Sequence, residues 1–129
     1  MKKILLISST FLGMTAVILG AMGAHWLKTQ LDASSLAAFE TGVRYQMYHA
    51  ILLLALGLWL KDENNRLLYT AYWSLLIGVV FFSGSIYLLS TSSMTGLGGI
   101  NFLGPITPLG GLLMITGWFL LLLHFIRKK

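Results

Sequence analysis

The sequence has no cysteine and few charged residues. The absence of cysteine from the 129 residues excludes disulfides, iron–sulfur clusters, thiolate metal sites and cysteine nucleophiles. Charged residues make up 10% of the chain, whereas a soluble domain carries about 25%. Hydrophobic residues make up 57%. This composition excludes an ordinary soluble domain and indicates a chain that lies in a lipid bilayer.

Acidic residues are also scarce: there are four, against nine Lys and Arg, for a net charge of +5. The basic residues stand at the ends of apolar runs and not in a patch with interleaved aromatics. That distribution is typical of membrane topology and not of nucleic-acid binding. We therefore expect the lipid bilayer, and no nucleic acid, as a partner.

The chemistry-bearing residues form no recognisable catalytic or metal-binding pattern. Only His25 and His49 could approach each other, and no His-x-x-x-His or Glu-x-x-His spacing supports a metal or haem between them. The serines lie in no Gly-x-Ser-x-Gly setting, and the acids lie away from these histidines. We expect no cofactor, no metal and no enzymatic activity.

Four apolar runs, each close to the ~20 residues that a helix needs to cross a bilayer, predict an all-α fold. We expect a single domain, an integral membrane four-helix transmembrane bundle, with spans at about 4–24, 43–60, 67–89 and 107–126. The mixed stretch 26–42 predicts a short interfacial helix between the first two spans, capped by Asp32 or Ser34. The polar run 61–66 predicts a tight hairpin, and the Ser- and Gly-rich stretch 90–104 predicts a flexible connection. Thr107 followed by Pro108 is typical of a helix start.

The first run is open to two interpretations. It ends in the small residues 20–24 and resembles a signal peptide, but its length exceeds the usual apolar core of ~7–15 residues, which favours an uncleaved helix. Ala16, Gly20 and Ala24 recur every four residues and predict close approach of a neighbouring helix. We expect Gly84 to permit such packing in the third span.

Basic residues are distributed unequally between the two sides of the expected bundle. Seven lie on the side of the termini and the 61–66 loop, while only Lys28 and Arg44 lie on the other. The positive-inside rule then predicts a multi-pass protein of the cell membrane with both termini in the cytoplasm.

Polar side chains inside spans are costly in lipid and therefore informative. In the expected topology they gather in the outer leaflet, where the candidate site comprises His25, Arg44, Tyr45, Gln46, His49, Ser83, Ser85 and Thr107. Gln46 and His49 could form hydrogen bonds between helices or belong to a ligand or transport site. We expect Ser83 and Ser85 to return hydrogen bonds to their own helix backbone. Trp118, in the middle of the fourth span, needs a partner for its indole N–H, and we expect a serine of the third span.

Ordered motifs over almost the whole chain resemble one family. They are Gly20-Ala21-Met22-Gly23-Ala24-His25-Trp26-Leu27, Phe39-x-Thr41-Gly42-x-x-Tyr45-Gln46-x-Tyr48-His49-Ala50, Phe82-Ser83-Gly84-Ser85-Ile86-Tyr87, Ile106-Thr107-Pro108-Leu109-Gly110-Gly111 and Gly117-Trp118. The chain looks like domain-of-unknown-function family 423, related to animal transmembrane protein 256; the one departure is Met22, where that family would have Phe. The resemblance implies a small multi-span plasma-membrane protein of bacterial type and brings no established activity.

Two functions remain open from the sequence. The first is a non-enzymatic accessory protein or lipid-contacting scaffold, which could associate with itself as a homo-oligomer or with another membrane protein. The alternative is a component of a small-solute or ion transporter or channel, with an outward-facing half-site made by Arg44, Gln46, His49 and Ser83. A charged residue at the bilayer midplane would favour transport, and we expect none.

Overall fold

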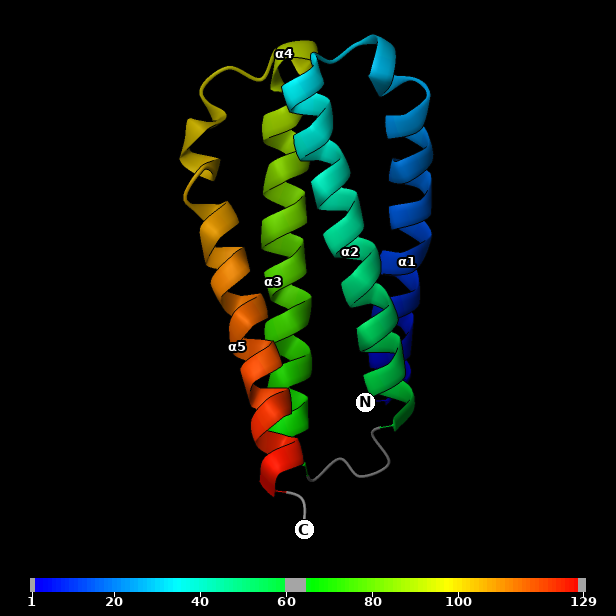
Figure 1. Cartoon of the computed structure of the whole chain (residues 1–129), viewed down its shortest axis with the longest axis vertical. Helices are drawn as coiled ribbons and strands as arrows, with labels where there is room; N and C mark the ends of the chain where they lie inside the picture. The colour runs from blue at the N-terminus through cyan, green and yellow to red at the C-terminus, as the bar shows by residue number, and fades with distance from the viewer. Residues whose placement is uncertain (1, 60–64, 128–129) are drawn as a thin grey trace.

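A computed structural model describes residues 2–59 and 65–127, and this part of the chain is helical throughout apart from short turns. Its long helices are α1 (Lys2–Ala24), α2 (Ala33–Trp59), α3 (Arg66–Ser90) and α5 (Ile106–Arg127) (Figure 1). Three short helical segments connect them: η1 (Leu27–Thr29), α4 (Ser92–Thr95) and η2 (Ile100–Leu103). Most of the polar run expected to form a hairpin at 61–66 lies outside the described residues.

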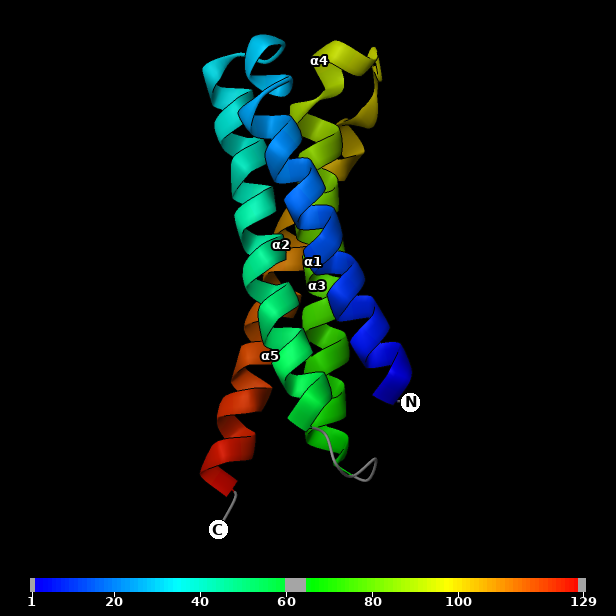
Figure 2. The same cartoon turned by 90° about the vertical axis from the view of Figure 1, so that its right-hand side faces the viewer.

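The long helices pack in a row and not in a closed ring. The main contacts join α1 to α2, α2 to α3 and α3 to α5, and Figure 1 shows the helices side by side in that order. Figure 2, turned by 90°, shows α1 crossing the bundle at an angle. The start of α1 and the end of α5 lie at one end, here the terminal end, and the short segments lie at the other, the α4 end. Helices α2 and α3 therefore have neighbours on both sides, while α1 and α5 flank them.

The start of α2 corrects one prediction. In place of a separate interfacial helix over 26–42, α2 runs without interruption from Ala33, and only the short η1 lies between α1 and α2. The Asp32 Oδ1 accepts the backbone N–H groups of Ser34 and Ser35 at 2.9 and 3.0 Å, so Asp32, and not Ser34, is the cap. Gly42 lies inside α2, and it is packed against the Tyr87 ring of α3.

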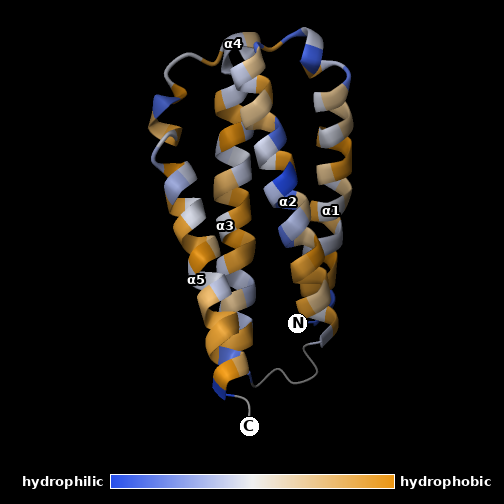
Figure 3. Cartoon of the chain, viewed as in Figure 1, coloured by the Kyte–Doolittle hydropathy of each residue, from blue (hydrophilic) through white to orange (hydrophobic). Residues whose placement is uncertain are grey.

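Among residues 2–59 and 65–127, three segments are long and apolar enough to cross a membrane: Lys2–Thr29, Arg66–Ser90 and Ile100–Arg127. They contain α1, α3 and α5 and cover three of the four expected spans. Helix α2 does not meet the same criterion, because polar residues gather in its first half (Figure 3). Length and composition therefore identify three of the long helices as membrane-capable.

Two apolar clusters fill the spaces between helices. The larger one, in the half nearer the terminal end, comprises Leu5, Leu53, Leu56, Leu68, Ala71, Tyr72, Leu75 and Leu121. The Tyr72 hydroxyl donates to the Leu5 carbonyl and lies 2.9 Å from the Ser8 hydroxyl, which ties α3 to α1. The smaller cluster, Leu27, Leu31 and Phe39, closes the α4 end.

Glycines on α3 and α5 bring these two backbones into contact. A Cβ added to Gly110 would collide with the backbone nitrogen of Phe82 and would lie 2.7 Å from the Gly78 carbonyl oxygen. A Cβ on Gly78 would lie 2.8 Å from the Met114 nitrogen. Gly84, which the sequence predicts to be the packing glycine of this helix, would meet nothing within 4 Å, so that prediction is wrong.

The contact face of α1 differs by one residue from the predicted stripe. Ala16 is buried, and a Cβ on Gly20 would lie 3.3 Å from Val43 Cγ1 of α2. Ala24, however, is exposed, and Gly23 lies against Phe39 in its place. Because a helix has about 3.6 residues per turn, a strict four-residue spacing drifts around it, whereas a seven-residue spacing returns nearly to the same face.

The connection 90–104 is more structured than expected, because it contains α4 and η2. Gly96 and Gly99, at φ of 66° and 80°, provide its left-handed turns. Helix α5 begins at Ile106, so Thr107 lies within its first turn, and the Thr107 hydroxyl bonds to Ser85 of α3.

Candidate functional site

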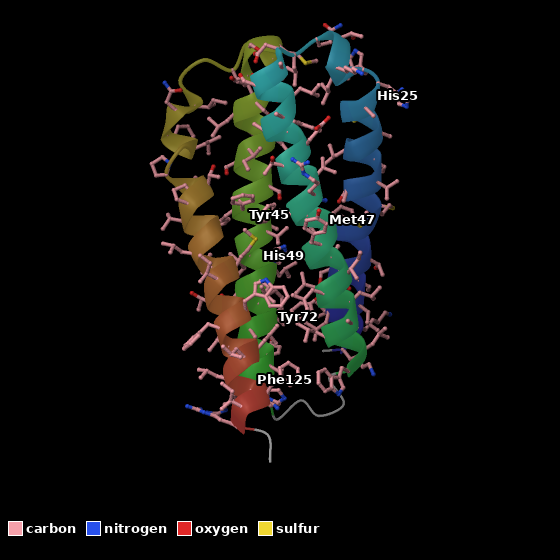
Figure 4. All side chains as sticks on the ribbon, viewed as in Figure 1. His25, Tyr45, Met47, His49, Tyr72 and Phe125 are labelled. Atoms are coloured by element: carbon pink, nitrogen blue, oxygen red, sulfur yellow. The ribbon has the colours of Figure 1, made fainter. Side chains whose placement is uncertain are left out.

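The polar stripe of α2 faces its neighbouring helices. Gln46 and His49 are 4% and 6% exposed, and Gly42 on the same stripe is buried. In Figure 4 the labelled Tyr45 and His49 lie along the middle of the bundle, and His25 lies apart from them near the α4 end of α1. The residues that the sequence groups in one leaflet thus divide into a buried set on α2 and α3 and an exposed set.

Gln46 is the centre of a network that joins three helices. Its amide Nε2 donates to the Leu12 carbonyl at 2.9 Å and to the Thr15 hydroxyl at 2.8 Å, both on α1. Its Oε1 accepts the Tyr87 hydroxyl of α3 at 2.7 Å. Both polar atoms of this buried amide are therefore bonded to neighbouring helices.

His49 links α2 to α5. Its Nδ1 lies 2.8 Å from the Tyr45 carbonyl, and because a carbonyl can only accept, this nitrogen carries the proton. The Nε2 is then an acceptor, and the Trp118 indole N–H donates to it at 3.3 Å. The expectation that Trp118 pairs with a serine of the third span is therefore wrong.

The serines of α3 also bond to other helices. The Ser83 hydroxyl donates to the Gly42 carbonyl of α2 at 2.8 Å, which corrects the prediction that it bonds to its own helix. The Ser85 hydroxyl donates to Phe82 in its own helix at 3.0 Å, as predicted, and also lies 2.6 Å from the Thr107 hydroxyl of α5. Three of the side chains that the transport alternative would use, Gln46, His49 and Ser83, thus make bonds to neighbouring helices.

Three of the predicted residues lie on the surface of the bundle. His25 is exposed and contributes nothing to the buried set. Arg44 is exposed, and its Nη2 donates to the Thr41 hydroxyl at 3.1 Å. Tyr45 is 41% exposed and its ring packs against Phe82, with centroids 4.9 Å apart.

A cavity of about 260 Å³, here the aromatic cavity, opens between α2, α3 and α5. Its walls are formed by Tyr45, His49, Phe82, Gly111, Met114, Ile115 and Trp118. Trp118 also borders a second hollow of about 360 Å³ between α2 and α5, here the apolar groove, which extends toward Trp59 and Phe125. Phe82, Gly111 and Met114 were not predicted from the sequence as residues of the site. Phe82 and Gly111 occur in the family motifs, which was a signal for them, whereas Met114 had none.

The site offers little for metal or acid–base chemistry. Within residues 2–59 and 65–127, no group of three or more His, Asp or Glu side chains could hold a metal ion. Among the acids in the described part of the chain, Asp32 is the one with a strongly perturbed carboxyl: at the α2 cap, hydrogen bonds from the Ser34 hydroxyl and from Ser35 hold its pKa well below the usual range. That carboxylate stabilises a helix start and does not border the aromatic cavity.

Comparisons with known proteins agree on one family. The model of a protein family of unknown function, DUF423, matches residues 19–111. Among similar curated proteins is a UPF0382 membrane protein of Staphylococcus saprophyticus, 39% identical over 94% of this chain and 95% of its own length. A UPF0382 membrane protein of Bacillus subtilis, YwdK, is 36% identical over 97% and 98%, and a UPF0382 inner membrane protein of Escherichia coli, YgdD, is 34% identical over 99% and 93%. No solved structure matches.

Proposed function

The chain belongs to the DUF423 family, whose relatives are UPF0382 membrane proteins, and from this premise we propose that it is a four-span, non-enzymatic component of the cytoplasmic membrane that contacts lipid and supports other membrane proteins. The name of the Escherichia coli relative, an inner membrane protein, supports this location. The resemblance drawn from the motifs and the family match thus agree.

The position of α2 supports four spans. It packs along α1 on one side and α3 on the other, and both of those helices are membrane-capable. Its buried polar atoms, at Gln46 and His49, are bonded to α1 and α5 as well as to its own backbone. A helix whose polar groups are satisfied by neighbours can lie in lipid despite a moderate hydropathy.

The orientation follows from charge and from the arrangement of the ends. The start of α1 and the end of α5 lie at the same end of the bundle (Figure 1), which an even number of spans requires. The basic bias toward that end supports a cytoplasmic position for it. A cytoplasm-active reporter fused after Lys129 should be active, and an exterior-active reporter should be active at Ser93; the reverse pattern would contradict the proposal.

One observation carries the non-transport interpretation: the buried polar side chains of the candidate site are already bonded across helix interfaces. Gln46, Ser83 and Ser85 connect α1, α2, α3 and α5 through bonds of 2.6–2.9 Å. A solute path would need these groups free along a continuous polar surface. The outer faces of α1 and α5, in contrast, expose large apolar side chains such as Phe11, Ile115 and Phe119, which suits contact with lipid or with a partner helix.

The decisive experiment compares association with flux. The protein is purified in a mild detergent and its bound proteins and lipids are identified by mass spectrometry, while the same preparation is placed in proteoliposomes and assayed for proton and small-solute flux from pH 5 to 8. We expect a reproducible lipid or protein partner, reduced when Phe11 and Phe119 are replaced by Ala, and no flux. Flux that His49→Gln abolishes without changing the melting temperature would favour the transporter.

A further inference from the structure

The aromatic cavity and the apolar groove together have the form of a site for a molecule with a flat head and an apolar tail. Both border Trp118, so they are adjacent along α5. The cavity has polar atoms and ring faces, whereas the groove is lined by Leu, Ala, Trp and Phe side chains. Ligand sites in proteins combine mostly apolar walls with a few placed polar groups, and this division fits an amphipathic ligand.

The walls of the cavity are largely aromatic. The rings of Tyr45 and Phe82 lie 4.9 Å apart and are tilted by 41°. The His49 ring stacks on that of Tyr45 at 6.1 Å and meets the indole of Trp118 edge-on at 6.3 Å. Aromatic side chains favour offset-stacked or edge-to-face contact with another ring, so this space suits a planar ring system.

The side chains that border the cavity leave one hydroxyl for a ligand. His49 uses both ring nitrogens, on Tyr45 and Trp118. Tyr45 borders the cavity and is 41% exposed, and no hydrogen bond joins its hydroxyl to a residue in the described part of the chain. A phenol donates to a carbonyl oxygen. Neither hollow is lined by a charged side chain, which disfavours a phospholipid headgroup and favours a neutral head with carbonyl acceptors.

The two hollows follow each other along α5. Gly111, in the cavity, is five residues from the start of α5, and Trp118 lies seven residues further, about 10 Å deeper at the helical rise. The groove continues from Trp118 to Phe125, two residues before the end of α5. The head would therefore lie between the α4 end and the middle of the bundle, and the tail would lie in the half nearer the terminal end.

We propose that this chain binds an isoprenoid quinone, with the ring between Tyr45, Phe82 and Trp118, a ring carbonyl accepting from the Tyr45 hydroxyl, and the tail in the apolar groove. The inference rests on the proposed lipid-contacting role and gives it a ligand class. It concerns binding alone.

The structure provides a matched pair of blocking variants. A Cβ on Gly111 would meet only Phe82 Cδ2, at 4.0 Å, and a Cβ on Gly84 would meet nothing within 4 Å. Both positions can therefore accept a Cβ without a collision, in contrast to Gly78, Gly110 and Gly117. Only Gly111 borders the cavity, so Gly111→Leu fills the head site, whereas Gly84→Leu adds the same side chain elsewhere.

The test measures quenching of tryptophan emission by decylubiquinone in detergent–lipid micelles, with farnesol, which has an isoprenoid tail and no ring, as the competitor. We expect saturable quenching, a Kd weakened about tenfold or more by Gly111→Leu, and about three- to tenfold by Tyr45→Phe, which removes the hydrogen bond. Gly84→Leu should leave the Kd unchanged. Circular dichroism and melting show that each variant is folded.

Two results would overturn the inference. Equal quenching in Gly111→Leu and in the parent protein would mean that the quinone does not occupy the cavity. Complete reversal of the quenching by farnesol at concentrations near the Kd of decylubiquinone would mean that the groove recognises a tail without a head. In either case the reporter fusions and the co-purification assay could still support the broader proposal, so failure of the quinone site is distinguishable from failure of the membrane-component role.

Discussion

The contact between α3 and α5 is the feature most easily tested by a single methyl group. A Cβ on Gly110 would collide with the Phe82 nitrogen and lie 2.7 Å from the Gly78 carbonyl oxygen and 2.9 Å from the Phe82 Cα. All three atoms belong to backbone, so no rotamer change can relieve the collision. The helices must separate, which breaks contacts along their whole interface.

The size of the effect follows from two opposing terms. Ala is a better helix former than Gly by roughly 1 kcal/mol, while overpacking a well-packed site costs about 1–3 kcal/mol. Gly111→Ala provides the control, since it gains the same helix propensity and its Cβ meets only Phe82 Cδ2 at 4.0 Å. We expect Gly110→Ala to be less stable than Gly111→Ala by about 2–3 kcal/mol, near the upper end of the overpacking range.

The assay is unfolding in mixed micelles by increasing SDS, followed by circular dichroism. A graded series sharpens it: a Cβ on Gly117 would meet the Leu75 side chain first and backbone only at 3.2 Å, at the Ala71 carbonyl oxygen, so the loss in Gly117→Ala should be smaller than that in Gly110→Ala. Equal stability of the Gly110 and Gly111 variants would refute the backbone contact. A larger loss at Gly117 than at Gly110 would show that the interface is centred further along α5.

Three further predictions concern hydrogen bonds. Gln46→Leu should lose about 2 kcal/mol of stability, because three interhelical bonds at about 0.6 kcal/mol each are removed, while the neighbouring Met47→Leu should stay near the parent in the same unfolding assay. His49→Leu and Trp118→Phe should be non-additive, with a coupling of about 0.6 kcal/mol in a double-mutant cycle; additivity would mean that the bond contributes nothing. The folded-state pKa of Asp32 lies below its ordinary value of 3.8. The contribution of this carboxylate to folding stability is therefore fully present above pH 3.8, and it is lost as the pH falls through the lower folded-state pKa. The melting advantage of the parent over Asp32→Ala should therefore be constant from pH 8 to about 5 and shrink below about 3.8; an advantage unchanged at low pH would exclude the charged cap.

The helical segments were predictable because each is delimited by residues that lipid does not tolerate. The expected span 67–89 lies within α3, which begins after Asn65, whose side chain accepts the Leu68 N–H at 3.2 Å. The expected span 107–126 lies within α5 in the same way. The start of α2 was missed because its first turns are amphipathic, and charge pattern alone does not distinguish an interfacial helix from the extension of a span.

The partners of the polar residues were less predictable, because they depend on how each helix is rotated about its axis. Helices α3 and α5 are apolar nearly all round, so periodicity indicates no preferred face. The sequence therefore gives no reason to choose Gly78 over Gly84 as the packing residue, or His49 over a serine as the acceptor for Trp118. A pair of seven-spaced glycines, Gly110 and Gly117, was the available signal for the α5 face.

Helix association in lipid lacks the hydrophobic driving force that acts in water, so it depends on close packing and on hydrogen bonds. This chain uses close packing between α3 and α5 and mainly hydrogen bonds between α2 and its neighbours, through Gln46, Ser83 and His49. The polarity that lowers the hydropathy of α2 is thus the means by which α2 is held. A solute that used Gln46 or Ser83 would have to replace bonds to α1, α2 or α3, and each passage would loosen the bundle. The polar stripe therefore favours a fixed structural component over a transport path, and it leaves the aromatic cavity, whose Tyr45 hydroxyl no described residue binds, as the place where a ligand can be held without cost to the fold.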